Sequence, residues 1–252
     1  MKLFKYRAHN QLTLSSLINN YSWYGNPSSF NDPFDYSLLT NSFLRERFLK
    51  SHNVFCLSEE NDNLLLWSHY ADCHKGYCVE YTDYSDDEIN VLKSKAIFPQ
   101  DQPNNKLTLI RNALKVEYLS SIQIEKYISQ FPKNDSELID QWKTVKTTDK
   151  EMAFLDEIRR SFLIKHELWS YESERRIMVE YKNMLSPPGK ITAIYFGMKM
   201  SSLDKRTIAQ IALDKFKGNC SLFTMYRSDT KYKLEFRDFK PELDFVGLDI
   251  KL

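Results

Sequence analysis

Residues 67–81 read WSHYADCHKGYCVEY, and this stretch decides the fold because it passes directly from a helical pattern to an extended one. Residues 62–71 suit a helix with one apolar face. The apolar positions of that helix are Leu64, Trp67 and Ala71. Gly76 ends the helix, since glycine readily adopts the backbone conformations that close one. The chain then continues as a strand over 77–81.

Further strands are predicted on both sides of this stretch, near the two ends of the chain. They cover 2–7, 22–24 and 54–57 before it, and 176–181, 191–196, 221–226 and 231–237 after it. Helices are predicted over 12–19, 37–50 and 202–216, and 106–165 is mostly helical, with its best helix at 150–165 and a short strand near 116–118. Residues 99–105, PQDQPNN, are predicted to form a surface loop.

This arrangement predicts an α+β fold, because the strands cluster in the first 85 and last 80 residues with helices between them. We expect a mixed, mainly antiparallel and split sheet, built from both ends of the chain and carrying a helical insertion over about 99–168. The chain is expected to form a single domain over residues 1–252. Two subdomains that meet near residue 100 are the alternative.

The composition excludes several classes of function. Thirty-five basic and 34 acidic residues leave a formal charge of +1, which gives no general attraction to nucleic acid or to an anionic membrane. There are only 6 glycines, and the dinucleotide-binding motif GxGxxG and the P-loop motif GxxxxGK[ST] are both absent. This disfavours a Rossmann or P-loop protein. The amino-terminal residues lack the apolar core of a signal peptide and no run approaches 18 apolar residues, so we expect a complete, cytoplasmic chain.

The first segment with candidate binding groups is NPSSFNDPFD at 26–35. Asn, Asp and Pro are typical of tight turns, so a rigid turn with Phe30 and Phe34 in the core is the simplest interpretation. Loops held by buried anchors also position binding groups. On that interpretation Ser29, Asn31 or Asp32 faces a ligand.

The second segment is WSHYADCHKGYC at 67–78. His69 and Cys73 are four residues apart on the predicted helix, a spacing at which two side chains can share a metal ion. A metal-dependent hydrolase or nuclease is therefore one alternative function. The other interpretations are that the aromatic rings simply pack, or that His69 or Tyr70 faces an organic ligand. The four cysteines form no CxxC pair and are expected to stay reduced.

The third segment is WSYESERR at 169–176. Glu172 and Glu174 are two residues apart, and in an extended chain such side chains point to the same face. Neighbouring carboxylates repel, which raises the pKa of one of them and suits acid–base chemistry. Alternatively, both glutamates pair with Arg175, Arg176 or Lys165 on the surface.

On the basis of five short motifs, the chain resembles the bacterial domain-of-unknown-function family 2971. The shared motifs are KYR at 5–7, FNDPF at 30–34, FCLSEE at 55–60, WSHYADCHKG at 67–76 and W-x-x-E-x-E-x-R at 169–176. The resemblance runs from residue 4 to about residue 200. It implies no particular activity.

The chain also resembles, more distantly, the ADP-ribosyltransferases of the arginine–serine–glutamate type. Their ordered residues match Arg7, Ser58 and the Glu172–Glu174 pair, although their Ser-Thr-Ser is Leu-Ser-Glu here. The resemblance implies NAD as substrate, with Arg7 on the pyrophosphate and Ser58 on the nicotinamide ribose. Glu174 would stabilise an oxocarbenium-like transition state, and Glu172 would activate the acceptor.

The function expected from this resemblance is an NAD-consuming enzyme, either a transferase or an NAD glycohydrolase. Tyr24 or Tyr70 would stack on the nicotinamide. The acceptor would be a protein or a nucleic acid, and a bacterial toxin or anti-phage effector is the expected setting. The alternatives are the metal-dependent enzyme, for which we assign no metal ligand, and a non-enzymatic module that binds a ligand or a partner.

Overall fold

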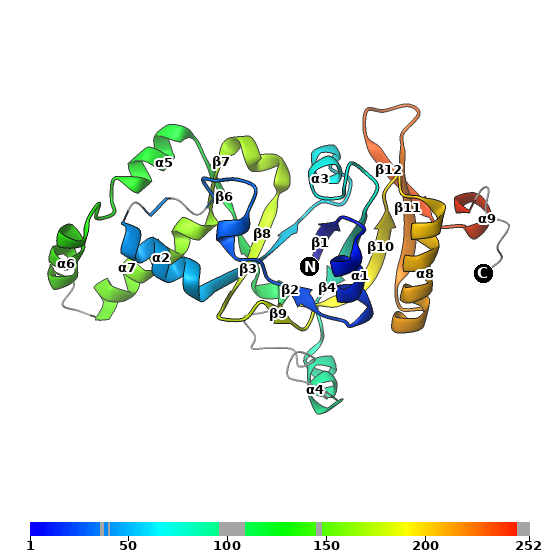
Figure 1. The fold of residues 1–252 in the computed structure, drawn as a ribbon, viewed down its shortest axis with the longest axis horizontal. Coiled ribbons are helices and arrows are strands. Elements are labelled where there is room, and N and C mark those ends of the chain that lie inside the picture. Colours follow the sequence, from blue (N-terminus) through cyan, green and yellow to red (C-terminus); the bar gives the residue numbers. More distant parts are fainter. Residues whose placement is uncertain (36–37, 40, 96–108, 145–147, 246–252) are drawn as a thin grey trace.

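An eight-stranded sheet runs through the middle of the protein (Figure 1). The computed structural model describes residues 1–35, 38–39, 41–95, 109–144 and 148–245. The strand order is β12-β11-β10-β4-β1-β3-β8-β5. These strands are β1 (Lys2–Arg7), β3 (His52–Ser58), β4 (Tyr77–Thr82), β5 (Leu114–Lys115), β8 (Glu174–Glu180), β10 (Lys190–Phe196), β11 (Ser221–Arg227) and β12 (Leu234–Asp238).

The pairing within this sheet confirms the predicted α+β class. β10 and β11 are parallel, and the other neighbouring strands are antiparallel. Seven of these eight strands come from the two ends of the chain, as expected, and β5 comes from the segment expected to be a helical insertion. Two small sheets add to it, β2 (Ser22–Trp23) with β9 (Met184–Leu185), and β6 (Glu117–Leu119) with β7 (Ile164–His166).

The large sheet separates between β1 and β3. These two strands share a single register pair, Phe4 with Ser58. By contrast, β1 follows β4 from Lys2 to Arg7, and β3 follows β8 along its whole length. A sheet that separates in this way leaves side chains of two adjacent strands facing a gap, and the candidate site described below lies there.

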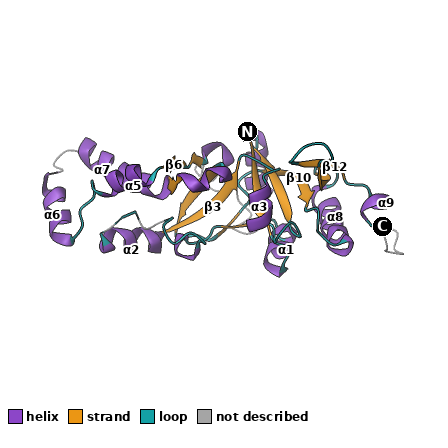
Figure 2. Cartoon of the chain, turned by 90° about the horizontal axis from the view of Figure 1, so that it is seen from above, coloured by secondary structure: helices purple, strands orange, loops and turns teal. Residues whose placement is uncertain are grey.

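Helices cover both faces of the sheet and also lie beyond both of its ends (Figure 2). They are α1 (Gln11–Ile18), α2 (Ser42–Ser51), α3 (Leu64–His69), α4 (Asp86–Lys95), α5 (Ser121–Ile128), α6 (Asp135–Thr144), α7 (Thr148–Arg160), α8 (Ser202–Phe216) and α9 (Pro241–Asp244). α5, α6 and α7 lie at one end of the molecule, and α8 and α9 at the other (Figure 1). Within the described ranges, no helix is long and apolar enough to cross a membrane.

Side chains alternate between the faces of each strand, and this produces two apolar cores. On one face Leu3 of β1 packs in the same core as Leu17 of α1 and Ile208 of α8. On the other face Phe4 shares a core with Trp67 of α3. A third core joins α2, α5, α7 and β7 at the end of the sheet, through Leu44, Tyr127, Ile158 and Ile164.

Three local predictions differ from the structure. The helix expected over 150–165 ends at Arg160, and the chain forms a 3-10 turn and then β7. The helix expected over 37–50 begins at Ser42, and the four-residue separation of His69 and Cys73 does not fall on a helix, because α3 ends at His69. The loop expected over 99–105 lies outside the described residues. Helix α4 was not predicted.

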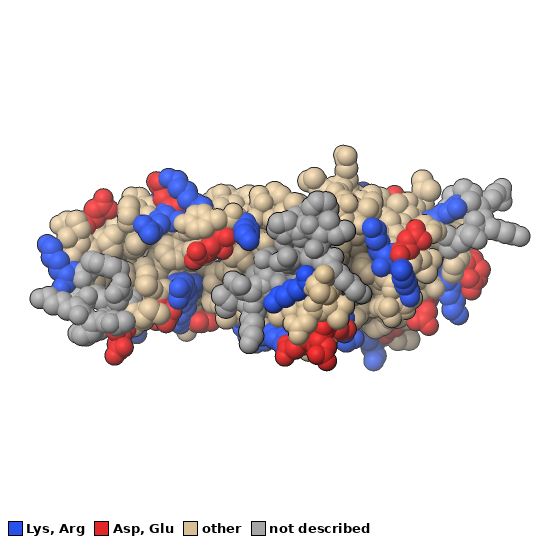
Figure 3. All heavy atoms as spheres, turned by 90° about the horizontal axis from the view of Figure 1, so that it is seen from below, with Lys and Arg blue, Asp and Glu red and all other residues tan. Residues whose placement is uncertain are grey.

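One face of the molecule shows acidic and basic side chains interspersed, with the acidic first turn of α4 beside lysine and arginine (Figure 3). This agrees with the near-neutral charge of the chain. On this face the described residues offer no extended basic surface of the kind that binds a nucleic acid backbone.

Gly76 leads into β4, where the chain passes close to the end of β1. A Cβ atom at this position would lie 2.1 Å from the carbonyl oxygen of Arg7. We expect Gly76→Ala to lower the free energy of unfolding by about 1–3 kcal/mol, because backbone must move to admit the methyl group. Gly25→Ala is the matched control, since its nearest neighbour would be the Phe30 ring at 3.4 Å. Equal urea unfolding midpoints for the two variants would contradict this account.

Candidate functional site

A cavity of about 180 Å³ lies where β1 and β3 separate. Residues 4–6 of β1 and 56–58 of β3 form two of its walls. The remaining described lining residues are Phe30, Asn31, Asp35, Leu66, Tyr70, Lys165, Glu172 and Glu174. The cavity therefore gathers all three segments that the sequence singled out, together with a buried lysine from β7.

Lys165 is the centre of an ion cluster behind this cavity. Its Nζ lies 2.5 Å from Glu172 Oε2, 3.3 Å from Glu174 Oε2 and 3.6 Å from Asp35 Oδ2. The lysine side chain is only 4% exposed, so water does little to screen these pairs. One ammonium group thus holds two carboxylates from its own part of the chain together with Asp35, which is distant in sequence.

Arg176 is the second cation of the cluster. Its guanidinium contacts Asp35 Oδ1 at 2.7 Å and Glu174 Oε1 at 2.9 Å, and its Nη1 also donates to the Phe162 carbonyl. The side chain is 2% exposed. Both oxygens of Glu174 accept hydrogen bonds, which leaves this carboxylate fully paired inside the protein.

The pKa values of the two glutamates move in opposite directions. Burial opposes ionisation of Glu174, but Arg176 and Lys165 together outweigh it and lower the pKa to about 2. Burial raises the pKa of Glu172 above its ordinary value, and the charge of Glu174 adds to this against the opposing effect of Lys165. The Tyr70 hydroxyl donates to Glu172 Oε1 at 2.5 Å.

The turn that presents the two glutamates is fixed by backbone contacts. Glu172 ends a 3-10 helix that runs over Glu167–Glu172, and Ser173 follows in the left-handed region with φ of 44°. Ser58 Oγ donates to the Glu172 carbonyl, and Asn63 Nδ2 donates to the Tyr171 carbonyl. The expectation of an extended chain through Glu172 was therefore wrong, and Lys165 rather than strand geometry brings the two carboxylates together.

Five of the predicted site residues line the cavity: Glu172, Glu174, Ser58, Tyr70 and Asn31. Asn31 Nδ2 donates to the Tyr70 hydroxyl at 3.3 Å, so the first and second segments meet here. The hydroxyl of Ser58 is bonded to the Glu172 backbone, which gives this serine a role in holding the turn.

The other four predicted residues lie outside the described lining of the cavity. Arg7 donates to Ser16 Oγ at 2.7 Å and to the Tyr81 hydroxyl at 3.2 Å. Tyr24 is buried against Phe55. Two further predicted residues have local roles.

Asp32 and His69 are the two predicted site residues that have local roles. Asp32 Oδ1 accepts from the Phe34 backbone N–H and so stabilises its own turn. The His69 ring is exposed and lies 6.3 Å from the rings of Tyr70 and Tyr171. Within the described ranges there is no group of three or more His, Cys, Asp or Glu side chains suited to a metal ion.

Sequence reasoning missed Asp35 and assigned Lys165 and Arg176 only to a surface pairing. The structure does pair Glu172 and Glu174 with these two cations, but in the interior. Asp35 ends the NPSSFNDPFD turn, where an aspartate is expected for local reasons. Its burial at 4% exposure was the missing information.

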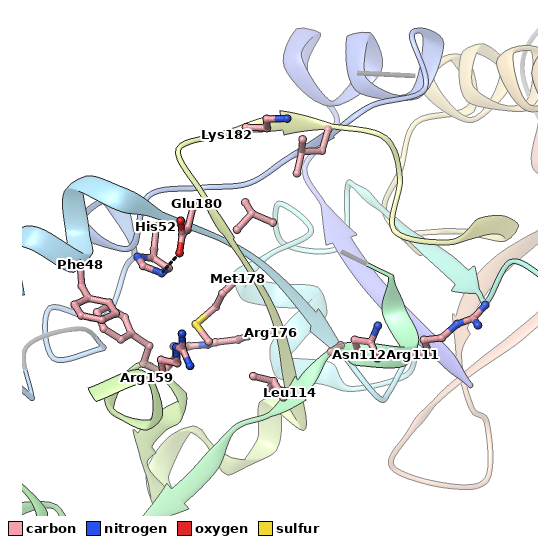
Figure 4. Close-up of a pocket in the computed structure, with 14 residues that line it drawn as sticks. Phe48, His52, Arg111, Asn112, Leu114, Arg159, Arg176, Met178, Glu180 and Lys182 are labelled. Atoms are coloured by element: carbon pink, nitrogen blue, oxygen red, sulfur yellow. Dashed lines mark hydrogen bonds and ion pairs between the residues drawn. The ribbon is translucent and has the colours of Figure 1, made fainter. Parts of the chain in front are cut away.

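A second, larger cavity of about 910 Å³ lies beside β8 (Figure 4). Phe48, Met178 and Leu114 contribute apolar surface, and Arg159 and Lys182 contribute positive charge. Arg176 lines this cavity as well and is also part of the ion cluster. Arg176 therefore connects the larger cavity to the ion cluster behind the smaller one.

Comparison with known proteins gives one partial match. Residues 66–177 match the family described as "Protein of unknown function (DUF2971)". The match covers less than half of the chain and includes the site residues Tyr70, Lys165, Glu172 and Glu174. No curated protein and no solved structure matches this chain.

Removing Arg176 tests whether the ion cluster holds the fold together. We expect Arg176→Met to lower the free energy of unfolding by about 3–5 kcal/mol, because Asp35 and Glu174 lose their buried partner. Arg175→Met on the same strand is the control, since its pair with Glu59 is partly exposed and contributes about 1 kcal/mol or less. Urea unfolding at neutral pH measures both, and similar losses would refute a special role for Arg176.

The opposite pKa shifts predict opposite pH dependences. Folding raises the pKa of Glu172, so the wild type should lose stability relative to Glu172→Gln as pH rises through 4.5 and above. Folding lowers the pKa of Glu174, so the stability that its ionised form contributes, about 3 kcal/mol, is present above pH 4.5 and is lost as pH falls toward 2.

Unfolding free energies from urea titrations at a series of pH values measure both effects. The difference between the wild type and Glu172→Gln should fall with rising pH, and the difference between the wild type and Glu174→Gln should grow. Two pH-independent differences would contradict the opposite shifts.

Proposed function

We propose that this protein is an enzyme that cleaves a glycosidic bond, with NAD as substrate and Glu172 as the reacting carboxyl group. The bond would be the one between nicotinamide and ribose, broken by hydrolysis or by transfer of ADP-ribose to a protein or nucleic acid. The sequence favoured Glu174 for the chemistry. The pairing of Glu174 with two cations favours Glu172 instead.

The observation that carries this proposal is the pair of carboxyl groups with separated pKa values at one cavity. Groups whose environments move their pKa values apart are suited to separate acid–base roles. Because its pKa is raised, Glu172 can accept or deliver a proton at a higher pH than an ordinary glutamate. Glu174 stays ionised and supplies negative charge, which favours the positive oxocarbenium-like state of glycoside cleavage.

Tyr70 and Asn31 support the role of Glu172. The Tyr70 hydroxyl donates to Glu172 Oε1 and accepts from Asn31 Nδ2, so a chain of hydrogen bonds fixes the orientation of the carboxyl group. Burial raises the pKa of Tyr70, which keeps this hydroxyl protonated as a donor. Lys165 holds the second oxygen of Glu172.

Aromatic rings beside the cavity suit a planar leaving group. The Trp169 and Tyr171 ring centroids are 6.0 Å apart, and Lys165 Nζ lies 4.9 Å from the Trp169 ring. The cavity volume of about 180 Å³ is below the roughly 300–1,000 Å³ of pockets that enclose a whole drug-sized ligand. It would take one ring of the substrate, and the rest of the dinucleotide would lie outside it.

A non-enzymatic ligand-binding module is the second candidate. The ion pairs of Glu174 with Arg176 and Lys165 favour it, because satisfied buried charges stabilise a wall without taking part in chemistry. The two candidates differ in one respect. An enzyme releases nicotinamide, and a module binds its ligand unchanged.

Release of nicotinamide from NAD by the purified protein tests the proposal. We expect Glu172→Gln to reduce the rate by roughly 10²-fold or more, the usual contribution of a general acid or base. Glu46→Gln on α2 is the control, since its side chain is 62% exposed and pairs only with Lys50 among the described residues. When urea unfolding is measured near pH 4.5, both variants should have the same midpoint as the wild type.

Absence of nicotinamide release, together with absence of label transfer from NAD to lysate components, would refute the enzyme. Retention of NAD binding by both the wild type and Glu172→Gln under those conditions would favour the module. A cytoplasmic toxin or anti-phage effector of a bacterium is the setting we propose for the enzyme.

A further inference from the structure

The outer edge of β8 is only partly covered. β5 pairs with β8 at two positions, Leu114 with Arg176 and Lys115 with Arg175. Before Leu114 the chain turns into a 3-10 helix (Ile110–Asn112), and the Ile110 N–H donates to the Pro188 carbonyl. The chain therefore leaves the strand direction, and within the described residues no strand pairs with 177–180 on this side.

The alternation of hydrogen-bonding direction along β8 shows which of its backbone N–H and C=O groups point toward the outer edge. The Val116 N–H donates to the Glu174 carbonyl on the β5 side, while the Tyr181 N–H donates to Ser51 beside β3. Hydrogen-bonding direction alternates along a strand, so Met178 and Glu180 direct their N–H and C=O groups away from β3. Among the described residues these groups have no backbone partner.

The exposed edge borders the larger cavity, and Figure 4 shows Met178 and Glu180 on the same strand beside it. Its volume of about 910 Å³ is enough for several side chains of an added segment. Phe48, Met178 and Leu114 would receive apolar side chains.

The charged groups around the cavity favour an acidic occupant. Arg111, Arg159 and Lys182 are lining residues, and Glu180 is the single acidic one among the described residues of the lining. Arg111 also pairs with Asp83 and Asp86, and Arg159 with Asp156, but these partly exposed carboxylates lie outside the described lining. Glu180 also lies 3.9 Å from His52. A segment with acidic side chains between apolar ones would match this surface.

We propose that residues 177–180 of β8 bind an extended acidic–apolar peptide segment of a partner protein, which adds as a strand beyond β5. Open strand edges pair readily with other chains, and main-chain hydrogen bonds give such complexes their affinity. Alternate side chains of the peptide enter the cavity, and this selects the sequence. The site is separate from the chemistry proposed for Glu172 and does not depend on it.

The test uses the purified full chain and a displayed library of eight-residue peptides. Enriched peptides should alternate apolar and acidic residues, and their affinity is measured by fluorescence anisotropy. Glu180→Pro should weaken binding at least about tenfold, because proline removes the outward N–H while an edge position tolerates it. Glu180→Ala is the matched control, since it removes the carboxylate and keeps the N–H.

A second arm leaves the protein unchanged. Two N-methylated peptides are compared, one methylated at its odd-numbered amides and one at its even-numbered amides. One of them should lose binding and the other should keep it, because only one set of amides faces β8. Equal affinities for Glu180→Pro and Glu180→Ala together with equal effects of both methylation patterns would overturn strand addition. A library that enriches no sequence class, or a basic one, would overturn the proposed occupant.

Discussion

The interaction on which the rest of the structure depends is the buried contact between Lys165 and its three carboxylates. Among the described residues, Lys165 and Arg176 are the cations in ion-pair contact with Asp35, Glu172 and Glu174. A third cation, the partly buried Lys5, lines the same cavity, and its charge acts on Glu172 and Glu174 as well. Burial opposes ionisation of Glu172 and raises its pKa, and the charge of Glu174 adds to this effect.

The same cluster explains where the chain folds differently from its local pattern. The apolar spacing of 150–165 predicts a helix to its end, yet α7 stops at Arg160 and Lys165 lies in β7. If the helix continued to residue 165, the direction of the Lys165 side chain would be set by the helix axis. In β7 it reaches the three carboxylates. The pairing of β7 with β6 and the burial of Phe162 and Ile164 in the third core act in the same direction, and together these long-range contacts outweigh a local preference for helix that is small per residue.

The sequence was sufficient for the class of the fold and for the segments that meet at the site. The strands at 54–57 and 77–81 were found because their apolar runs are bounded by turn residues, and they correspond to β3 and β4. Arg7 lies outside the described lining of the smaller cavity, where it donates to Ser16 and Tyr81 while its buried Nε has no hydrogen-bond partner among the described residues. No local pattern shows that Asp35 contacts Arg176, because the two residues are far apart in the chain.

β8 connects the two surfaces that the structure offers. Glu174 at its beginning faces the smaller cavity, and Glu180 at its end borders the larger one. Arg176 between them lines the larger cavity and holds Glu174 and Asp35. Arg176 is therefore the residue through which the strand edge at 177–180 adjoins the ion cluster, because it contacts both Asp35 and Glu174. The peptide binding proposed at that edge does not depend on the chemistry proposed for Glu172.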